Sequence, residues 1–160
     1  MALSMNNLNA KNYNTREGFS DLLKELFAEA DRQTNLAYAP YSNFRVGAAV
    51  LDQEGNIYGG SNQENASYPL CMCAERVALY HCISAYQDVK IAAIAITARS
   101  EKRSLDNFVS PCGACRQVMV EYEKRFGIPM KLYLLHANGS VLELDSVSNL
   151  LPLSFDGKVL

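Results

Sequence analysis

The 160-residue sequence has no excess of positive charge. Its 15 lysine and arginine residues are outnumbered by 17 aspartate and glutamate residues, and the formal net charge is −2. Proteins that bind the phosphates of DNA or RNA need a basic surface, whereas the charged residues here are interspersed without a run of one sign. We therefore expect no nucleic acid partner.

Long apolar segments and targeting signals are also missing. No apolar run approaches the ~18 residues that a membrane-spanning helix needs. Residues 1–14 contain five Asn and one Lys, without a basic start followed by an apolar stretch, so they resemble neither a secretory nor a mitochondrial signal. These absences predict a cytoplasmic protein that has no contact with a membrane.

The length and composition predict one domain. A hydrophobic content of 49% in 160 residues is enough for one buried core and too little for two. We expect residues 1–14 to form a flexible Asn-rich segment and residues 15–160 to form the domain.

Helical periodicity alternates with short apolar runs along the domain. Three segments have helical spacing of apolar residues, the first of them capped by Thr15, and a short helix is expected before Pro152. The expected helices are 15–38, 73–86, 113–126 and 146–151, and the expected strands are 44–51, 57–61, 91–97, 131–136 and 141–144. Because helices separate strands, the order predicts an α/β fold, a three-layer α/β/α sandwich with a central five-stranded mixed sheet.

The five cysteines are clustered as C-x-C and C-x-x-C, which in a reducing compartment favours metal binding or catalysis over disulfides. Cys73 and Cys112 each stand at the predicted start of a helix, where free N–H groups and the helix dipole stabilise a thiolate. Cys115 lies three residues after Cys112, close enough to bind the same ion. Three protein ligands are typical of catalytic zinc, whose fourth ligand is a water with a pKa of ~7. Glu75, two residues after a ligand, is placed to move protons at that water.

Other interpretations of these residues remain open. A lone C-x-x-C also occurs in structural zinc sites and redox proteins. Cys71 is a possible fourth ligand, which would close the site and make it structural. We expect Cys82 to be a core residue, and His81 and His136 to be structural or exposed.

Beyond the cysteines, four segments carry a wider resemblance. They are C-A-E-R-V-A-L at 73–79 with P-C-G-A-C-R-Q at 111–117, A-P-Y-S-N-F-R-V-G-A-A at 39–49, N-Q-E-N-A-S-Y at 62–68, and L-L-P at 150–152 followed by Phe155. In order and spacing they resemble the small homotetrameric cytidine deaminases, a zinc-dependent nucleoside deaminase family. The resemblance spans roughly residues 19–155. Nucleic acid deaminases carry His at the position of Cys73, which favours the free-nucleoside branch.

The resemblance implies roles for individual residues. Cys73, Cys112 and Cys115 would hold one Zn²⁺ per subunit, and Glu75 would be the catalytic proton shuttle. The substrate-binding residues would be Asn62 and Glu64 on the ribose hydroxyls, Phe44 on the pyrimidine face, Ala74, and Tyr68 and Phe155 from neighbouring subunits of a homotetramer. For each aromatic residue, ordinary core packing is the alternative.

The charge of a three-thiolate zinc site suggests a role for Arg76. Three thiolates and one Zn²⁺ carry a net charge of −1, which reduces the Lewis acidity of the metal. Arg76 lies one helical turn from Cys73, so a hydrogen bond from its guanidinium to sulfur would offset this charge; the alternative is a surface arginine. Gln117 is a second candidate for such support.

Together these residues predict hydrolytic deamination of cytidine and 2′-deoxycytidine to uridine and 2′-deoxyuridine in pyrimidine salvage. Three alternatives stay open: a deaminase for a cytosine-nucleoside antibiotic such as blasticidin, a non-catalytic zinc module, and a nucleic acid base editor. The acidic net charge weighs against the base editor, and a ribose-binding Asn62 and Glu64 favour a nucleoside.

Overall fold

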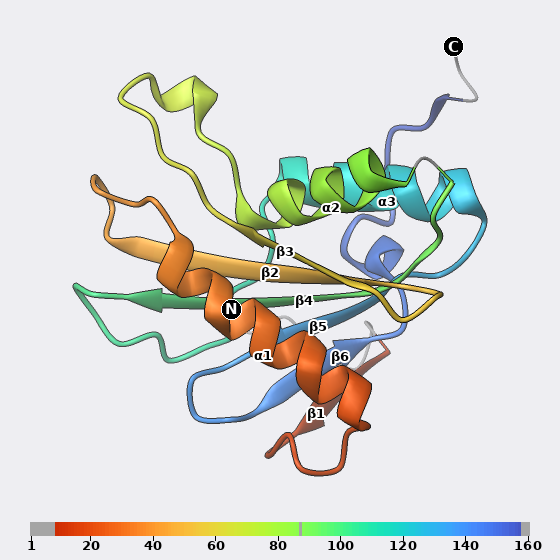
Figure 1. The fold of residues 1–160 in the computed structure, drawn as a ribbon, viewed down its shortest axis with the longest axis horizontal. Helices are drawn as coiled ribbons and strands as arrows, with labels where there is room; N and C mark the ends of the chain where they lie inside the picture. The colour runs from red at the N-terminus through yellow and green to blue at the C-terminus, as the bar shows by residue number, and fades with distance from the viewer. Residues whose placement is uncertain (1–8, 87, 158–160) are drawn as a thin grey trace.

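A six-stranded mixed sheet forms the centre of the computed structural model, which describes residues 9–86 and 88–157 (Figure 1). The strand order is β1-β6-β5-β4-β2-β3. Strands β4 and β5 run parallel, and the other neighbouring pairs are antiparallel. The strands are β1 (Ala10–Tyr13), β2 (Phe44–Asp52), β3 (Ile57–Ser61), β4 (Ile91–Ser100), β5 (Lys131–Leu135) and β6 (Val141–Leu144).

Helices cover both faces of this sheet and confirm the predicted α/β sandwich. Helix α1 (Asp21–Leu36) crosses one face, while α2 (Ala74–Ala85) and α3 (Gly113–Phe126) lie side by side on the other (Figure 1). Each face has its own core: Leu26 and Phe27 of α1 are buried on the first, and Leu79 and Met119 on the second. In the described part of the chain, the 3₁₀ helix η2 (Tyr68–Leu70) precedes α2 and the 3₁₀ helix η3 (Val147–Leu150) follows β6.

The predicted count of five strands is one too low. Strand β1 pairs antiparallel with β6 at the edge of the sheet, and it lies within the segment that we expected to be flexible. Its sequence, A-K-N-Y, has no run of apolar residues to indicate a strand. Two contacts of Tyr13 stabilise the pairing of β1 with β6. The centroid of the Tyr13 ring lies 4.8 Å from that of Phe19, and the Tyr13 hydroxyl donates to the Glu143 carboxylate at 3.2 Å. The remainder of the expected flexible segment, residues 1–8, lies outside the described residues.

The first helix begins later than its sequence pattern predicts. Its N-cap is Ser20, whose Oγ accepts a hydrogen bond from the Leu23 amide at 3.4 Å. Thr15 instead accepts from the Glu17 amide at 3.2 Å in the preceding turn. Both residues are good N-caps, so side-chain preference alone could not distinguish them. None of the helices in the described ranges is long and apolar enough to cross a membrane.

Candidate functional site

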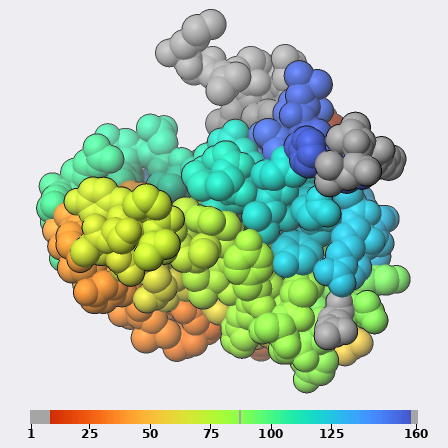
Figure 2. All heavy atoms as spheres, turned by 90° about the horizontal axis from the view of Figure 1, so that it is seen from above, coloured from red at the N-terminus to blue at the C-terminus, as the bar shows by residue number. Residues whose placement is uncertain are grey.

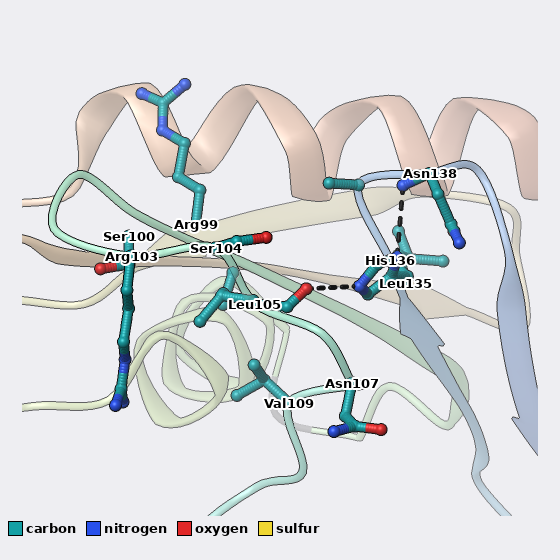
Figure 3. A pocket seen from close by; sticks show the side chains of 12 residues that line it. Arg99, Ser100, Arg103, Ser104, Leu105, Asn107, Val109, Leu135, His136 and Asn138 are labelled. Carbon is teal, nitrogen blue, oxygen red and sulfur yellow. Dashed lines mark hydrogen bonds between the residues drawn. The ribbon is translucent and has the colours of Figure 1, made fainter.

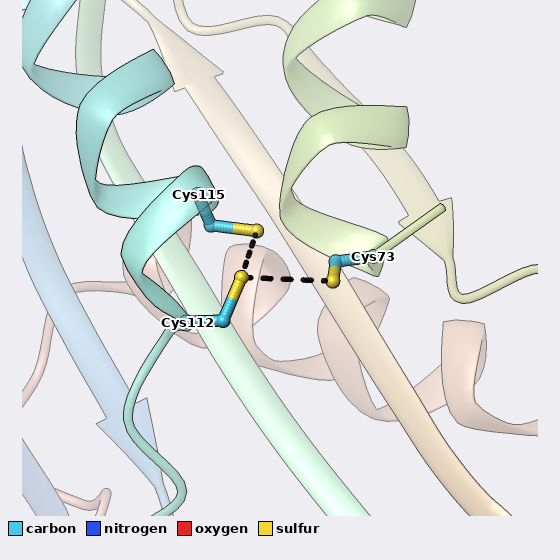
Figure 4. Close-up of side chains that lie close together, drawn as sticks. All are labelled: Cys73, Cys112 and Cys115. Atoms are coloured by element: carbon cyan, nitrogen blue, oxygen red, sulfur yellow. Dashed lines mark hydrogen bonds between the residues drawn. The ribbon is translucent and has the colours of Figure 1, made fainter. Parts of the chain in front are cut away.

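Three cysteine sulfurs converge where the N-terminal ends of α2 and α3 meet. Cys73 is the N-cap of α2, Cys112 is the N-cap of α3, and Cys115 lies in the first turn of α3 (Figure 4). The Sγ atom of Cys112 is 3.9 Å from that of Cys73 and 3.5 Å from that of Cys115. All three sulfurs lie within 4.8 Å of one another.

These residues fit a zinc ion. A tetrahedral zinc with Zn–S bonds of about 2.3 Å separates its sulfur ligands by about 3.8 Å, close to the spacings between these atoms. Hydrogen bonds from Cys115 and Arg76 lower the pKa of Cys73, which favours the thiolate that a metal binds. Three thiolate ligands leave one of four positions for water, as in catalytic zinc sites.

Cys71 does not join this cluster in the described structure. Its sulfur accepts a hydrogen bond from the Asn65 amide at 3.2 Å and so closes the loop that contains η2. This arrangement gives no support to a four-cysteine structural site. Cys82, a residue of α2, is fully buried in the core, as the helical spacing of apolar residues predicts.

Glu75 is the buried acid of the site. Its exposed fraction is only 4%, and it stands in the first turn of α2, two residues after Cys73. Burial raises the pKa of Glu75, and the negative charge of Cys73 raises it further. A carboxyl with a raised pKa exchanges protons near neutral pH more readily than an exposed one, which suits a general acid and base.

Arg76, in the first turn of α2, points its guanidinium toward the thiolate cluster. Its Nη2 is 3.8 Å from the Cys73 sulfur, the relationship that the charge argument predicts. Its Nε is buried without a hydrogen-bond partner in residues 9–86 and 88–157. Gln117, the second candidate for supporting the metal, donates instead to the Phe155 carbonyl at 3.0 Å and holds the C-terminal segment.

A cavity of about 280 Å³ opens beside the sulfurs. It brings together Phe44, Asn62 and Glu64 with Cys73, Glu75 and Cys112. The loops that border it, at 62–72 and 101–111, gather at one end of the molecule, where Figure 2 shows them in yellow and green beside each other. Cys71, considered above as a possible ligand, also lines it. Sequence reasoning gave no role to the rest of the lining, which is Val46, Gln63, Met72, Ile96, Val109 and Ser110.

The residues expected on the ribose are hydrogen-bonded to the start of β2 and to the segment that leads into it. Glu64 accepts from the Tyr41 amide at 2.9 Å and from Ser42. Asn62 donates to the Phe44 carbonyl at 2.9 Å and accepts from the Val46 amide at 2.8 Å. Burial raises the pKa of Glu64, but the bonds from Ser42 and Tyr41 outweigh it and lower the pKa overall, so this carboxylate is ionised at neutral pH.

The other expected substrate residues lie apart from this lining. Tyr68 and Phe155 have exposed fractions of 70% and 61%, and neither lines the cavity of its own chain. Ala74 is fully buried as the first residue of α2. Pattern recognition could name these positions, but it could not show which of them meet within one chain.

A second cavity, of about 430 Å³, lies beyond the ends of β4 and β5 (Figure 3). Its lining includes His136, a residue type that often acts in catalysis. Both nitrogens of this ring are hydrogen-bonded, Nε2 to the Leu105 carbonyl at 2.7 Å and Nδ1 to the Asn138 amide at 3.3 Å. The lining contains no cysteine or carboxylate. Since His136 only supports the surrounding loops, the cysteine-lined cavity is the candidate site.

The model of the cytidine and deoxycytidylate deaminase zinc-binding region matches residues 20–128. That range includes all three clustered cysteines and Glu75. The chain belongs to this deaminase family.

Individual relatives agree with the family assignment. A cytidine deaminase of Halalkalibacterium halodurans is 43% identical over 132 residues, covering 81% of this chain and 91% of the relative. A cytidine deaminase of Sporosarcina psychrophila is 40% identical over 83% of this chain and 90% of the relative. The crystal structure of the Burkholderia pseudomallei cytidine deaminase superposes with a TM-score of 0.74 at 39% identity, covering 86% of this chain and all of that one. The sandwich is therefore a cytidine deaminase fold.

Proposed function

We propose that this chain is a cytidine deaminase, which hydrolyses cytidine and 2′-deoxycytidine to uridine and 2′-deoxyuridine and releases ammonia in pyrimidine salvage. The observation that carries the proposal is the placement of Glu75. This buried carboxyl lines the same small cavity as two cysteines of the metal cluster and as Phe44, Asn62 and Glu64. Metal activation, proton transfer and nucleoside recognition thus share one cavity.

Zinc would be held by Cys73, Cys112 and Cys115. Bound zinc would supply hydroxide at neutral pH, because it lowers the pKa of water. Glu75 takes the proton released from the attacking water and delivers it to the ring nitrogen beside the amino-bearing carbon. Water oxygen adds to that carbon. Glu75 then takes the proton of the added hydroxyl and delivers it to the amino group, which leaves as ammonia while the hydroxyl oxygen becomes the carbonyl of the product. One carboxyl acts as base and then as acid in each of the two transfers, because its raised pKa lets it hold each proton before passing it on.

Arg76 keeps the three-thiolate cluster reactive. Its guanidinium donates toward the Cys73 sulfur at 3.8 Å and so withdraws negative charge from the ligand set. The pyrimidine packs against Phe44, while Asn62 and Glu64 bind the ribose.

The proposal includes a homotetramer in which neighbouring subunits complete each site. Tyr68 and Phe155 are aromatic, largely exposed and outside the lining of their own cavity, as expected of side chains supplied to a neighbour. The substrate partner is a small nucleoside, and no nucleic acid or membrane takes part; the enzyme works in the cytoplasm. Light scattering of the purified protein should give four times the mass of one chain, and a monomer that deaminates cytidine at full rate would contradict the shared sites.

A substrate panel tests the proposed function. Purified zinc-loaded protein is assayed for ammonia release from cytidine, 2′-deoxycytidine, dCMP, adenosine and blasticidin. We predict a kcat/KM for the two cytosine nucleosides that exceeds the others by at least about tenfold, since Glu64 and Asn62 bind a free sugar and Phe44 packs against a pyrimidine. A preference for blasticidin would favour the antibiotic deaminase, and zinc retention without turnover of any compound would favour the non-catalytic module.

A further inference from the structure

The Ser42 hydroxyl joins two walls of the cavity. Ser42 donates this hydroxyl to the Glu64 carboxylate, and the same oxygen accepts a hydrogen bond from the Phe44 amide at 3.0 Å. One hydroxyl therefore connects the carboxylate assigned to the ribose with the backbone of the residue assigned to the base.

The acceptor capacity of Glu64 is largely used by this one segment. Its Oε2 accepts from the amides of Tyr41 at 2.9 Å and Ser42 at 3.3 Å, and its Oε1 accepts from the Ser42 hydroxyl. An ionised carboxylate offers about four acceptor positions. Three are filled by Tyr41 and Ser42, which fixes the direction of the remaining one and leaves it for a ligand.

Phe44 is held at both ends of its backbone. Its amide donates to Ser42, and its carbonyl accepts from the Asn62 side chain at 2.9 Å. Asn43, between Ser42 and Phe44 in the chain, adopts φ +56°, a left-handed conformation uncommon for residues other than glycine. Asn is one of the few residues besides glycine that tolerate this conformation, so the residue type and the hydrogen bonds favour the same path.

We infer that Ser42 is a positioning residue of the nucleoside site, which orients Glu64 toward the ribose 3′-hydroxyl and in the same act holds Phe44 against the base. This inference rests on the proposed function. Loss of the hydroxyl frees Oε1 of Glu64 to rotate and removes the acceptor of the Phe44 amide. Binding of the sugar and stacking of the base then weaken together, while the groups that carry out proton transfer stay in place.

The test is the variant Ser42→Ala, assayed on cytidine and 3′-deoxycytidine. We expect KM for cytidine to rise about tenfold, the effect of one lost hydrogen bond to a charged group, with kcat within twofold of the parent. KM for 3′-deoxycytidine should rise less, because that ligand has no 3′-hydroxyl for Glu64 to bind. Ser42→Thr, which keeps the hydroxyl, should restore the parent KM.

Two controls separate this inference from loss of fold and from the proposed function. Ser84→Ala removes an exposed serine that donates to the His81 carbonyl on α2, and it should leave both kinetic constants unchanged. If Ser42→Ala does not fold, Ser42→Cys replaces it in the same assays. An unchanged KM, an equal rise for both ligands, or a threonine variant that behaves like the alanine variant would overturn the role of Ser42. A parent protein without activity on cytidine would instead refute the proposed function.

Discussion

Gly60 of β3 and Ala78 of α2 are in direct backbone contact. A Cβ atom at position 60 would lie 2.3 Å from the Ala78 nitrogen and 2.7 Å from the Ala74 carbonyl oxygen. Only glycine lets the helix approach the sheet this closely. The contact fixes the height of α2 above β3, and with it the position of Cys73 at the N-terminus of that helix.

The variant Gly60→Ala should destabilise the protein. Both nearby atoms belong to backbone and cannot rotate away, so α2 must move; overpacking of this kind costs about 1–3 kcal/mol. Thermal unfolding measures the loss, and zinc affinity should fall with it because Cys73 moves with α2. Gly18→Ala is the matched control, since a Cβ there meets nothing within 4 Å. Equal melting temperatures for parent and Gly60→Ala would show that the close approach has no energetic consequence.

Replacing Glu75 by Gln should abolish turnover and leave the metal site intact. The amide has the same shape but cannot carry a proton between water and base, and proton transfer of this kind contributes about 10²–10⁴-fold to the rate. Zinc content and the unfolding transition should match those of the parent. Glu25→Gln, on the exposed face of α1, is the control for loss of one carboxylate. Near-normal kcat in the Glu75 variant would remove this residue from the mechanism.

Arg76→Ala should weaken zinc retention or catalysis without unfolding the domain. The substitution removes the positive charge 3.8 Å from the Cys73 sulfur, so the negative charge of the three-thiolate cluster is no longer offset by this neighbour. Dialysis against a chelator measures retention, and the initial rate on cytidine measures catalysis. Arg32→Ala, which removes an exposed arginine paired with Glu29 on α1, is the control. If the two alanine variants were kinetically alike, the charge argument would fail.

The turn between β2 and β3 should contribute acid-sensitive stability. Asp52 is 2% exposed and accepts hydrogen bonds from the Asn56 side-chain amide at 2.9 Å and from the Tyr58 hydroxyl at 3.1 Å. The backbone amides of Glu54 and Asn56 also donate to it, at 2.8 and 2.9 Å. Burial alone would raise the pKa of Asp52, but these bonds lower it overall. A carboxyl with a lowered folded-state pKa stabilises the protein above its unfolded pKa of about 3.9, and this contribution is lost as the pH falls through the folded value.

The variant Asp52→Asn tests that contribution. Denaturant unfolding at pH 7 should show a loss of about 1–3 kcal/mol, because an amide cannot accept all of these bonds. The difference between parent and variant should shrink below about pH 4, first because Asp52 takes up a proton in the unfolded chain and then because it does so in the folded protein at its lower pKa. The exposed neighbour Glu54, replaced by Gln, should show little effect at either pH. A difference that stays constant with pH would exclude the ionised carboxylate as its source.

The cysteine set was predictable from sequence for a local reason. Cys73 and Cys112 each begin a helix, and the interval of three residues to Cys115 brings two sulfurs together whatever the rest of the chain does. Only the meeting of α2 with α3 required the fold. The layers of the sandwich likewise followed from periodicity, because buried helix faces and apolar strands leave strong local signals.

Tertiary contacts decided what the sequence pattern missed. Strand β1 is polar and forms through pairing with β6, so no local signal indicates it. Ser20 rather than Thr15 caps α1, although both are good N-cap residues. Val109 lines the cavity only because the connection from β4 to α3 folds back over the sheet. Ser42 stood within a segment of family resemblance, but its two hydrogen bonds follow from the path of the loop.

Zinc content and cytidine turnover, measured on the same set of proteins, test directly whether the three-cysteine zinc site is catalytic. Zinc per chain and the rate of cytidine conversion to uridine are measured for the parent, Cys73→Ser and Cys71→Ser. We predict one zinc per chain and full activity in the parent and in Cys71→Ser, and loss of both in Cys73→Ser. Zinc loss from Cys71→Ser, or undiminished cytidine turnover by Cys73→Ser without zinc, would contradict a catalytic three-cysteine zinc site.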